Sequence, residues 1–205
     1  MDLEDIKQFV KKRLSEKRYF HSLCVMEKCE ELAKQYNVDV ITAKKIGIAH
    51  DIAKELADEE KLAYIKENNI EIDDIEKNNL GLLHAKIGAD IAKKTFNFSD
   101  EMCDAINYHC TAKEDMSMLC KILYIADWTG NDRTFENAIK IRNILSNDGI
   151  DKAILFALNM VIEEQLEKNR EIHIDTINAR NYLLGGNIWD LFIWQIYILT
   201  HLLLF

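Results

Sequence analysis

Residues 41–54 read ITAKKIGIAHDIAK, an apolar run with helical spacing that ends near a histidine and an aspartate side by side. Burying an ionisable pair such as His50-Asp51 is costly unless its charge is compensated, and a bound cation provides such compensation. Small residues let a neighbouring helix approach closely, and three recur along this run: Ala43, Gly47 and Ala49. The stretch therefore predicts a closely packed helix that carries polar ligands into the core.

The same apolar periodicity extends through most of the 205 residues. Proline is absent and glycine occurs only seven times, which favours helices joined by short polar turns. Candidate helices cover residues 3–16, 20–37, 39–56, 58–68, 80–95, 99–110, 117–130, 136–146, 151–168 and 175–184. Four residues are candidate N-caps because they precede apolar periodic runs: Asp39, Ser99, Ser117 and Asp175. The sequence predicts a compact, all-α, multi-helix fold.

The chain contains no internal repeat and no linker that would divide it, so residues 1–186 are expected to form one domain. Residues 187–205, NIWDLFIWQIYILTHLLLF, are the most apolar segment. They barely reach membrane-spanning length, and Asp190, Gln195 and His201 interrupt them. We expect this tail to pack on the domain or on a partner subunit. Membrane contact and an unnatural end are less favoured alternatives.

The net charge of −9 argues against nonspecific binding to nucleic acid or to anionic lipid. A polyphosphate remains a suitable ligand if cations are concentrated locally. The five cysteines lie in apolar stretches without a C-x-x-C pair: Cys24, Cys29, Cys103, Cys110 and Cys120. Their pattern favours reduced core residues of a cytoplasmic protein over disulfides or a thiolate-zinc site. The N-terminus contains no apolar run of signal-peptide type.

Four of the six histidines and two aspartates lie within apolar, helix-patterned stretches: His21, His50, His84, His109, Asp51 and Asp127. Six ligands are too many for one ion that must leave room for water and substrate, so they suit two ions. Asp51 would bridge them, with His21, His50 and Asp127 on one ion and His84 and His109 on the other. Nitrogen and oxygen ligands without thiolate fit iron, manganese or cobalt at least as well as zinc. Any one histidine alone is more often a hydrogen-bonded core residue.

These residues carry a resemblance to the HD superfamily of metal-dependent phosphohydrolases, and more closely to its YqeK-type symmetrical bis(5′-nucleosyl)-tetraphosphatase family. The resembling segments are RYFHSL from Arg18, AHDIAK from Ala49, LLHAKIGA from Leu82, INYHCTAKEDMSMLCKILYIAD from Ile106, NDR ending at Arg133, and IHIDTINARNYLL from Ile172. The resemblance implies an HD-domain fold and a di-iron centre. It also implies hydrolysis of diadenosine tetraphosphate to two ADP by a metal-activated hydroxide, with Asp51 at the centre of catalysis.

Two short stretches depart from the family. This chain has Ala112-Lys113 where the family tends to have Gly-Arg, and Thr129-Gly130-Asn131 where the family often has Glu-Pro. Lysine keeps the charge of arginine but loses its bidentate fork, so affinity or base preference can differ.

Several residues are candidates for contacts with the nucleotide substrate. Lys54 is the first, as a catalytic cation, because it follows His50 by four residues and would share its helical face. Arg18 and Arg133 are the next candidates for phosphate. His173 and Thr176 lie in a family-like turn before a helix, whose amides can hold a phosphate or ribose. His173 is equally well explained as a structural turn residue.

Other functions remain open at this level. Another HD phosphohydrolase, such as a nucleotidase or a cyclic-dinucleotide phosphodiesterase, would use the same ligands. A nucleotide-sensing protein without activity would keep the pocket, whereas a purely structural helical protein would leave the buried His and Asp residues without a role. The sequence does not decide the metal, the base preference or whether the chain forms a homodimer.

Overall fold

The computed structural model describes residues 1–185, and within that range the chain consists of helices joined by turns. The helices are α1 (Leu3–Lys11), α2 (Glu16–Gln35), α3 (Val40–Ala49), α4 (Asp58–Glu67), α5 (Asp74–Asn78), α6 (Leu83–Ile91), the π-helical turn η1 (Ala92–Phe96), α7 (Asp100–Asn107), α8 (Met118–Thr129), α9 (Glu136–Asp148), α10 (Ile150–Glu167) and α11 (Ile174–Gly185). The predicted all-α fold is confirmed. The apolar tail, residues 187–205, lies outside the described residues.

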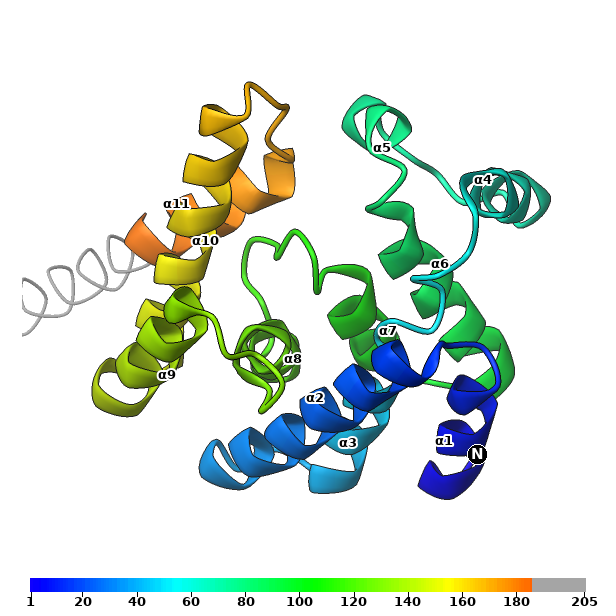
Figure 1. Ribbon diagram of the computed structural model, residues 1–205, viewed down its shortest axis with the longest axis horizontal. Coiled ribbons are helices and arrows are strands. Elements are labelled where there is room, and N and C mark those ends of the chain that lie inside the picture. Colours follow the sequence, from blue (N-terminus) through cyan, green and yellow to red (C-terminus); the bar gives the residue numbers. More distant parts are fainter. Residues whose placement is uncertain (186–205) are drawn as a thin grey trace, which may run out of the picture.

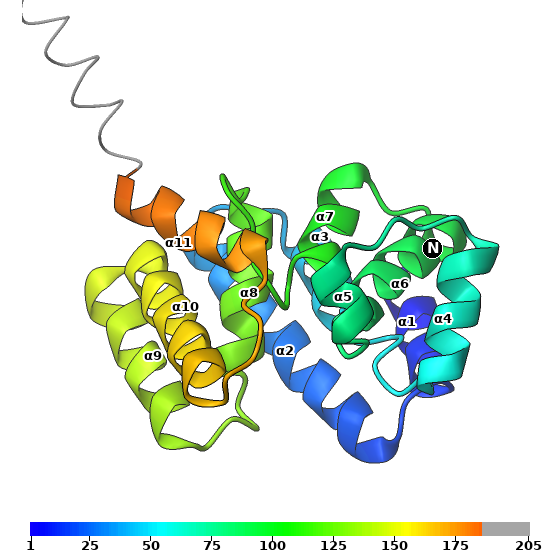
Figure 2. The same ribbon diagram turned by 90° about the horizontal axis from the view of Figure 1, so that it is seen from above.

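The helices form two groups, one on each side of the molecule (Figure 1). Helices α8 to α11 make up one group, and α1 with α4 to α7 makes up the other. Helices α2 and α3 pack along each other, and α8 packs against both α2 and α7, which joins the groups. The turned view in Figure 2 separates the same two groups, with α8 beside α2. Segments distant in the sequence therefore meet along the line between the groups.

Helices α2 and α3 approach closely at Gly47. A Cβ atom at this position would lie 2.8 Å from the Cα of Met26 on α2, which leaves no room for any side chain. Ala43 and Ala49 on the same helix are fully buried. The prediction that small residues in this stretch admit a neighbouring helix is confirmed, and the neighbour is the helix that carries His21.

Asparagine performs much of the helix termination that glycine performs in other chains. Four asparagines have the left-handed backbone conformation just beyond a helix: Asn37, Asn69, Asn97 and Asn169. Asparagine is among the few residues other than glycine that enter this region readily, because its short side chain can form local hydrogen bonds. The chain can therefore end its helices with seven glycines and no proline.

Three of the four predicted N-caps are confirmed. The side chains of Asp39, Ser99 and Ser117 each accept a hydrogen bond from a backbone amide in the first turn of α3, α7 and α8. The prediction for Asp175 is wrong, because α11 begins one residue earlier, at Ile174. The backbone amide of Asp175 donates instead to Nδ1 of His173, at 3.2 Å. An imidazole nitrogen thus takes the place of a carboxylate at this helix start.

Other helix boundaries also differ from the predictions. The predicted helix 3–16 ends at Lys11, because the chain turns there and Ser15 caps α2. Helix α5 was not predicted. Its start is nevertheless encoded locally, since Asp73 and Glu76 form a reciprocal capping box, with bonds of 2.8 and 2.9 Å.

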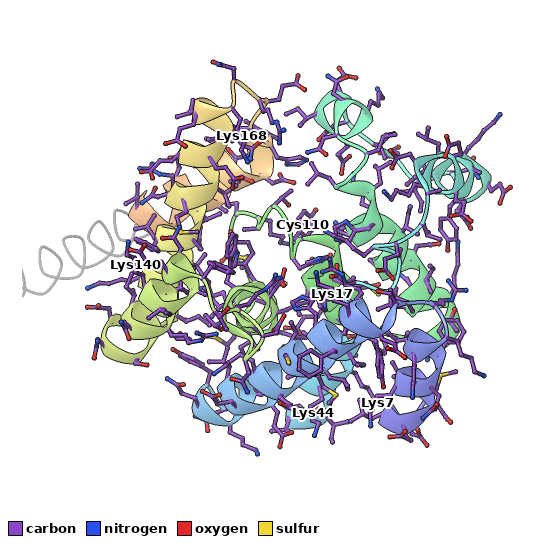
Figure 3. All side chains as sticks on the ribbon, viewed as in Figure 1. Lys7, Lys17, Lys44, Cys110, Lys140 and Lys168 are labelled. Carbon is purple, nitrogen blue, oxygen red and sulfur yellow. The ribbon has the colours of Figure 1, made fainter. Side chains whose placement is uncertain are left out.

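The surface and the interior of the described chain differ clearly in their side chains. Figure 3 shows Lys140 and Lys168 on the outer side of the α8–α11 group, while Cys110 lies near the middle, where the two helix groups face each other. None of the described helices is both long enough and apolar enough to cross a membrane. Among the buried polar side chains, five meet at one place in the interior: His21, His50, Asp51, His84 and His109.

Candidate metal centre

The chain leaves the helical path at the histidine-aspartate pair. Helix α3 ends at Ala49, and the predicted helix 39–56 is wrong beyond this point because residues 50–55 form successive tight turns. In a continuous helix, adjacent residues point about 100° apart. The turns instead direct both side chains of the pair to one place, where His50 Nε2 lies 3.4 Å from Asp51 Oδ2.

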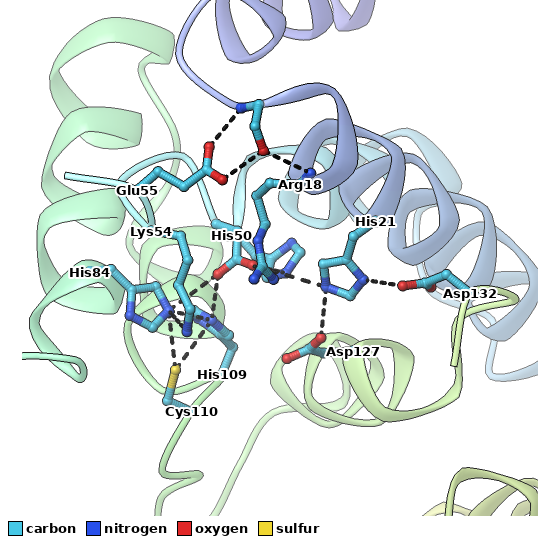
Figure 4. Close-up of polar contacts among 12 residues, drawn as sticks. Arg18, His21, His50, Lys54, Glu55, His84, His109, Cys110, Asp127 and Asp132 are labelled. Carbon is cyan, nitrogen blue, oxygen red and sulfur yellow. Dashed lines mark hydrogen bonds and ion pairs between the residues drawn. The ribbon is translucent and has the colours of Figure 1, made fainter. Parts of the chain in front are cut away.

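One carboxylate oxygen of Asp51 faces a first group of side chains, of which Figure 4 labels His21, His50 and Asp127. Besides His50, Nε2 of His21 on α2 lies 3.9 Å from Asp51 Oδ2. The same nitrogen lies 3.0 Å from Oδ1 of Asp127, which α8 contributes. His21, His50 and Asp127 are close enough together to hold one metal ion.

The other oxygen of Asp51 faces a second group. Oδ1 lies 3.2 Å from Nε2 of His84 on α6 and 3.6 Å from Nε2 of His109, which follows α7. The two imidazole nitrogens are 3.2 Å apart. Asp51 itself is buried, and it stands between the two groups as the sequence predicted for a bridging residue.

Each histidine is oriented through its other ring nitrogen. In three of them, Nδ1 donates to the backbone carbonyl three residues earlier: His50 to Gly47 at 2.8 Å, His84 to Gly81 at 2.6 Å and His109 to Ile106 at 2.6 Å. Because a carbonyl oxygen only accepts, Nδ1 carries the proton and Nε2 is left with its lone pair. This arrangement is typical of histidines that bind metals.

Asp132 orients the fourth histidine, and it was missed in the sequence. Its Oδ2 accepts a hydrogen bond of 2.7 Å from Nδ1 of His21. Asp132 lies in the NDR segment quoted for the resemblance, and only its neighbour Arg133 was considered as a functional residue. A carboxylate behind a histidine raises the basicity of the imidazole and fixes its tautomer.

The centre therefore gathers hydrogen-bond acceptors that face one another. With Nδ1 protonated, His21 Nε2 and Asp127 Oδ1 are both acceptors 3.0 Å apart, and Nη2 of Arg133 brings positive charge to them, at 3.3 and 2.6 Å. His50 Nε2 is buried, and among residues 1–185 no hydrogen-bond donor reaches it. These observations fit a site for divalent cations, whose ligands are lone pairs of this kind.

Nearby positive charge also sets the pKa values of the two carboxylates in the centre. Burial alone would raise the pKa of Asp51, but the imidazoles of His50, His109 and His84, when protonated, outweigh it and hold this pKa well below its ordinary value. Burial also raises the pKa of Asp127, but the hydrogen bond from His21 and the charges of His50 and Arg133 outweigh it. The pKa of Asp127 is therefore well below its ordinary value. Both carboxylates are therefore ionised at neutral pH.

Cys110 lies in the second group, in contrast to its predicted role as a core residue. Its Sγ is 3.3 Å from Nε2 of both His84 and His109, and the residue is only partly buried. Burial raises the pKa of the Cys110 thiol, but the His109 and His84 imidazoles lower it well below its usual value. The donors at this end of the centre thus include sulfur, which the prediction of nitrogen and oxygen ligands did not contain.

The three predicted cations all reach the centre. Lys54 Nζ lies 3.2 Å from His84 Nε2, although the shared helical face on which it was selected does not exist, because α3 has already ended. Arg18 Nη1 donates to Asp51 Oδ2 at 3.0 Å. Arg133 Nη2 donates to Asp127 Oδ1 at 2.6 Å.

The two other predicted nucleotide contacts lie apart from the centre. Thr176 Oγ1 donates to the carbonyl of Thr111 at 2.8 Å. His173 Nε2 lies 3.1 Å from Oδ2 of Asp73 at the start of α5. Thr176 thus ties α11 to the loop after α7, and His173 ties the start of α11 to the opposite helix group, which agrees with the structural alternative for His173. Arg180 Nε on the same helix donates to Asn159 Oδ1 on α10 at 2.6 Å, which ties α11 to α10.

One cavity opens at the first group of side chains, and a larger groove lies beyond a small cavity at Cys110. One has a volume of about 480 Å³ and is here called the arginine cavity; its walls include Lys17, Arg18, Phe20, His21 and Arg133. The other, here called the amide groove, has a volume of about 510 Å³, and its walls include Asn78, Asn79, Gln165 and Asn169. A smaller cavity of about 80 Å³ shares Asn79 and Gln165 with the amide groove and reaches Cys110 and Thr111.

The turn that carries His109 and Cys110 contains a strained residue. Ala112 has a φ of +59°, a left-handed conformation that costs an L-amino acid with a Cβ atom roughly 1–2 kcal/mol. The family that the sequence resembles tends to have glycine at this position. Lys113, which replaces the family's arginine, pairs with Asp104 on α7 at 2.7 Å and does not contact the predicted ligands.

Comparison with known proteins places this centre in a family. The model of the HD domain matches residues 18–132, the range that contains all six predicted ligands and Cys110. The chain is also 35% identical to the symmetrical bis(5′-nucleosyl)-tetraphosphatase of Halalkalibacterium halodurans, over 86% of this chain and 94% of the relative. The chain belongs to the HD-domain family of symmetrical bis(5′-nucleosyl)-tetraphosphatases.

Further relatives agree. The protein of the same name from Bacillus subtilis is 29% identical to this HD-domain chain, over 91% of this chain and 100% of the relative. A crystal structure from Clostridium acetobutylicum, described as a predicted HD superfamily hydrolase involved in NAD metabolism, matches with a TM-score of 0.86 and 34% identity. The match covers 91% of this chain and 98% of that structure. The predicted fold and family are both confirmed.

Proposed function

We propose that this chain is a metal-dependent hydrolase that cleaves diadenosine tetraphosphate, and related dinucleoside polyphosphates, symmetrically into two nucleoside diphosphates. The proposal rests on the position of Asp51. Its two carboxylate oxygens face two separate groups of buried acceptors. The activity named for the Halalkalibacterium halodurans relative, which matches nearly the whole chain, supports the choice of reaction.

The proposed ligands are those predicted from the sequence. His21, His50, Asp51 and Asp127 would hold one cation, and Asp51 with two further histidines, His84 and His109, would hold the other. When bound there, two divalent cations stabilise the charge of the attacked phosphate and lower the pKa of water, so that hydroxide is available near neutral pH. Iron is the proposed metal, with manganese and cobalt as alternatives; this choice rests on the family resemblance and on the predominance of imidazole and carboxylate.

The products define which bond breaks. An oxygen of water bonds to one of the two central phosphorus atoms, and the bond from that phosphorus to the oxygen linking it to the other central phosphorus breaks. That bridging oxygen leaves as part of one ADP, and the water oxygen remains on the other ADP. One water is consumed and no other reactant is needed.

The cations of the protein are proposed to stabilise phosphate charge. Lys54 Nζ lies beside the second group of ligands, so its ammonium can donate to a non-bridging oxygen of a phosphate held there. Arg18 and Arg133 lie at the first group, where each contacts one proposed ligand carboxylate. A bound polyphosphate would compete for these two guanidinium groups and accept their hydrogen bonds.

The cavities on the two sides suit a substrate with two nucleosides. The arginine cavity combines cations with Phe20, which is 59% exposed and can stack on a base. Beside the charged Arg170 and Glu171, the amide groove offers amide side chains such as Asn79 and Asn169, which can donate to and accept from the edge of a base. We propose that the tetraphosphate lies across the centre, with one nucleoside in each cavity.

His173 and Thr176 remain proposed contacts of this second nucleoside, because both line the small cavity next to Cys110. The single domain at 1–186, a cytoplasmic location and a homodimer remain predictions as well. The reduced cysteines and the nucleotide substrate support the cytoplasmic location.

The proposed function is tested by identifying the products. Metal-loaded protein incubated with diadenosine tetraphosphate should yield ADP alone, and the Asp51→Asn variant should yield none. AMP with ATP would show asymmetric cleavage, and free phosphate would indicate a nucleotidase. Binding of the nucleotide without turnover in metal-loaded protein would support a sensing role instead.

A further inference from the structure

Four donor atoms surround one point at the second end of the centre. They are His84 Nε2, His109 Nε2, Asp51 Oδ1 and Cys110 Sγ, contributed by α6, by the turns after α3 and by the turn after α7. Five of the six distances among these atoms lie between 3.2 and 3.6 Å. Figure 4 shows the two imidazoles and the sulfur directed toward one another.

These separations are those of a coordination tetrahedron. For an ion with nitrogen ligands at about 2.0 Å and sulfur at about 2.3 Å, tetrahedral angles place two nitrogens roughly 3.3 Å apart and nitrogen and sulfur roughly 3.5 Å apart. The two imidazole nitrogens are 3.2 Å apart, and the sulfur is 3.3 Å from each. The sulfur therefore lies where a further ligand beside the two imidazoles would lie, and these three residues form one candidate ligand group.

The surroundings give independent support for cations in this centre. His50 Nε2, in a side chain that is fully buried, has no hydrogen-bond partner in the described part of the chain. Its ring lies edge-on to that of His109, with the ring centroids 5.1 Å apart, and Asp51 and His109 form a further candidate ligand group with it. An unpartnered buried nitrogen that faces this cluster is accounted for by positive charge at the centre.

We propose that the Cys110 thiolate is a ligand of the cation held by His84, His109 and Asp51, an inference that rests on the proposed metal-dependent function. Binding of the cation releases the thiol proton to solvent as the sulfur–metal bond forms. Lys54, whose Nζ is 3.2 Å from His84 Nε2, then turns toward bound phosphate.

The two ends of the centre are in that case chemically different. The first end has only nitrogen and oxygen donors, whereas the second has a soft sulfur donor, which favours zinc or iron over manganese. Four protein ligands also leave a four-coordinate ion without an open position. Water and phosphate would then enter through the first end or as a fifth ligand at the second.

The test uses cobalt as a spectroscopic probe. The full chain is dialysed against chelator, loaded with two equivalents of Co²⁺, and examined for the near-ultraviolet thiolate-to-cobalt charge-transfer band. We expect this band in the unmodified protein and in Cys103→Ser, and we expect Cys110→Ser to lack it. Cys103 is a matched control because it is also partly buried, but its sulfur contacts the carbonyl of Phe98 at 3.8 Å. Cys110→Ser should also bind its second cobalt at least about tenfold more weakly.

The outcomes separate this inference from the proposed function. Two bound cobalt ions without the band, or a band that survives in Cys110→Ser, would overturn the sulfur ligand and leave the hydrolase intact. Failure to bind any cobalt would overturn the metal-dependent function and this inference with it. If Cys110→Ser does not fold, X-ray absorption at the cobalt edge of the unmodified protein decides the matter, since one sulfur per two cobalt ions is expected.

Discussion

Replacement of Gly47 by alanine should disturb both the stability and the metal centre. The new Cβ would lie 2.8 Å from the Cα of Met26, which is 0.6 Å less than the 3.4 Å at which ordinary contacts begin. The Met26 Cα is a backbone atom and cannot rotate away. Helix α2 must therefore move outward relative to α3 by roughly this amount.

The magnitude follows from two opposing effects. Overpacking of a close helix contact costs about 1–3 kcal/mol, while alanine in place of glycine inside a helix returns about 0.5–1 kcal/mol. A backbone contact belongs in the upper part of the first range, so the net expectation is a loss of roughly 1–2 kcal/mol. Because α2 carries His21 and a misplacement of about 1 Å can cost about 100-fold in rate, a shift of this size should lower kcat roughly tenfold.

Gly88→Ala is the matched control. Gly88 also lies inside a buried helix, but a Cβ there would meet its nearest neighbour, the carbonyl oxygen of His50, at 3.4 Å. This variant should be unchanged or more stable by up to about 1 kcal/mol, with normal turnover. Both variants are compared by urea unfolding of the metal-free protein, so that cation binding does not contribute to the difference.

The reasoning fails if Gly47→Ala unfolds at the same urea concentration as the unmodified chain, or at a higher one, and retains full activity. Equal losses in both glycine variants would also refute it, because the loss would then have no connection with the α2–α3 distance.

Four further substitutions test the centre and its supporting turn. Asp51→Ala should abolish turnover and metal content together, as measured by product analysis and metal analysis; full activity without metal would contradict this role. Lys54→Ala should raise KM or lower kcat while the metal content stays normal, and unchanged kinetics would remove Lys54 from the site. Asp132→Asn should weaken metal binding about 10–100-fold in equilibrium dialysis, because His21 loses its orienting carboxylate; an unchanged affinity would argue against that orientation. Ala112→Gly should raise the free energy of unfolding by about 1 kcal/mol, since glycine adopts a φ of +59° without strain; a loss of stability in urea unfolding would show that the turn needs its methyl group.

Much of the fold follows from local sequence pattern. Apolar residues at helical spacing and capping residues such as Asp39 act within one turn of the chain, so they can be recognised without tertiary contacts. Gly47 is also informative locally, because a glycine among apolar residues of a helix indicates the close approach of another backbone. Even the unpredicted α5 carries its own signal in the capping box of Asp73 and Glu76.

The positions of individual side chains at the centre depend on contacts between distant segments. Cys110 follows His109 in an apolar stretch, and only the turn after α7 directs its sulfur toward two imidazoles. Asp132 reaches His21 because α2 and α8 pack together. The spacing of residues along the chain does not reveal these contacts. The sequence pattern therefore predicted a core residue at Cys110 and no functional residue at Asp132.

By itself, the sequence determined that the described chain is helical and to which family the chain belongs, because these properties rest on local periodicity and on the identity of short motifs. Only the tertiary structure decided that α3 ends before Asp51, that the two oxygens of Asp51 face separate groups, and that a sulfur joins one of them. The physical reason is that helix packing and the turns at helix ends set the direction of each side chain, and both depend on residues far away in the chain.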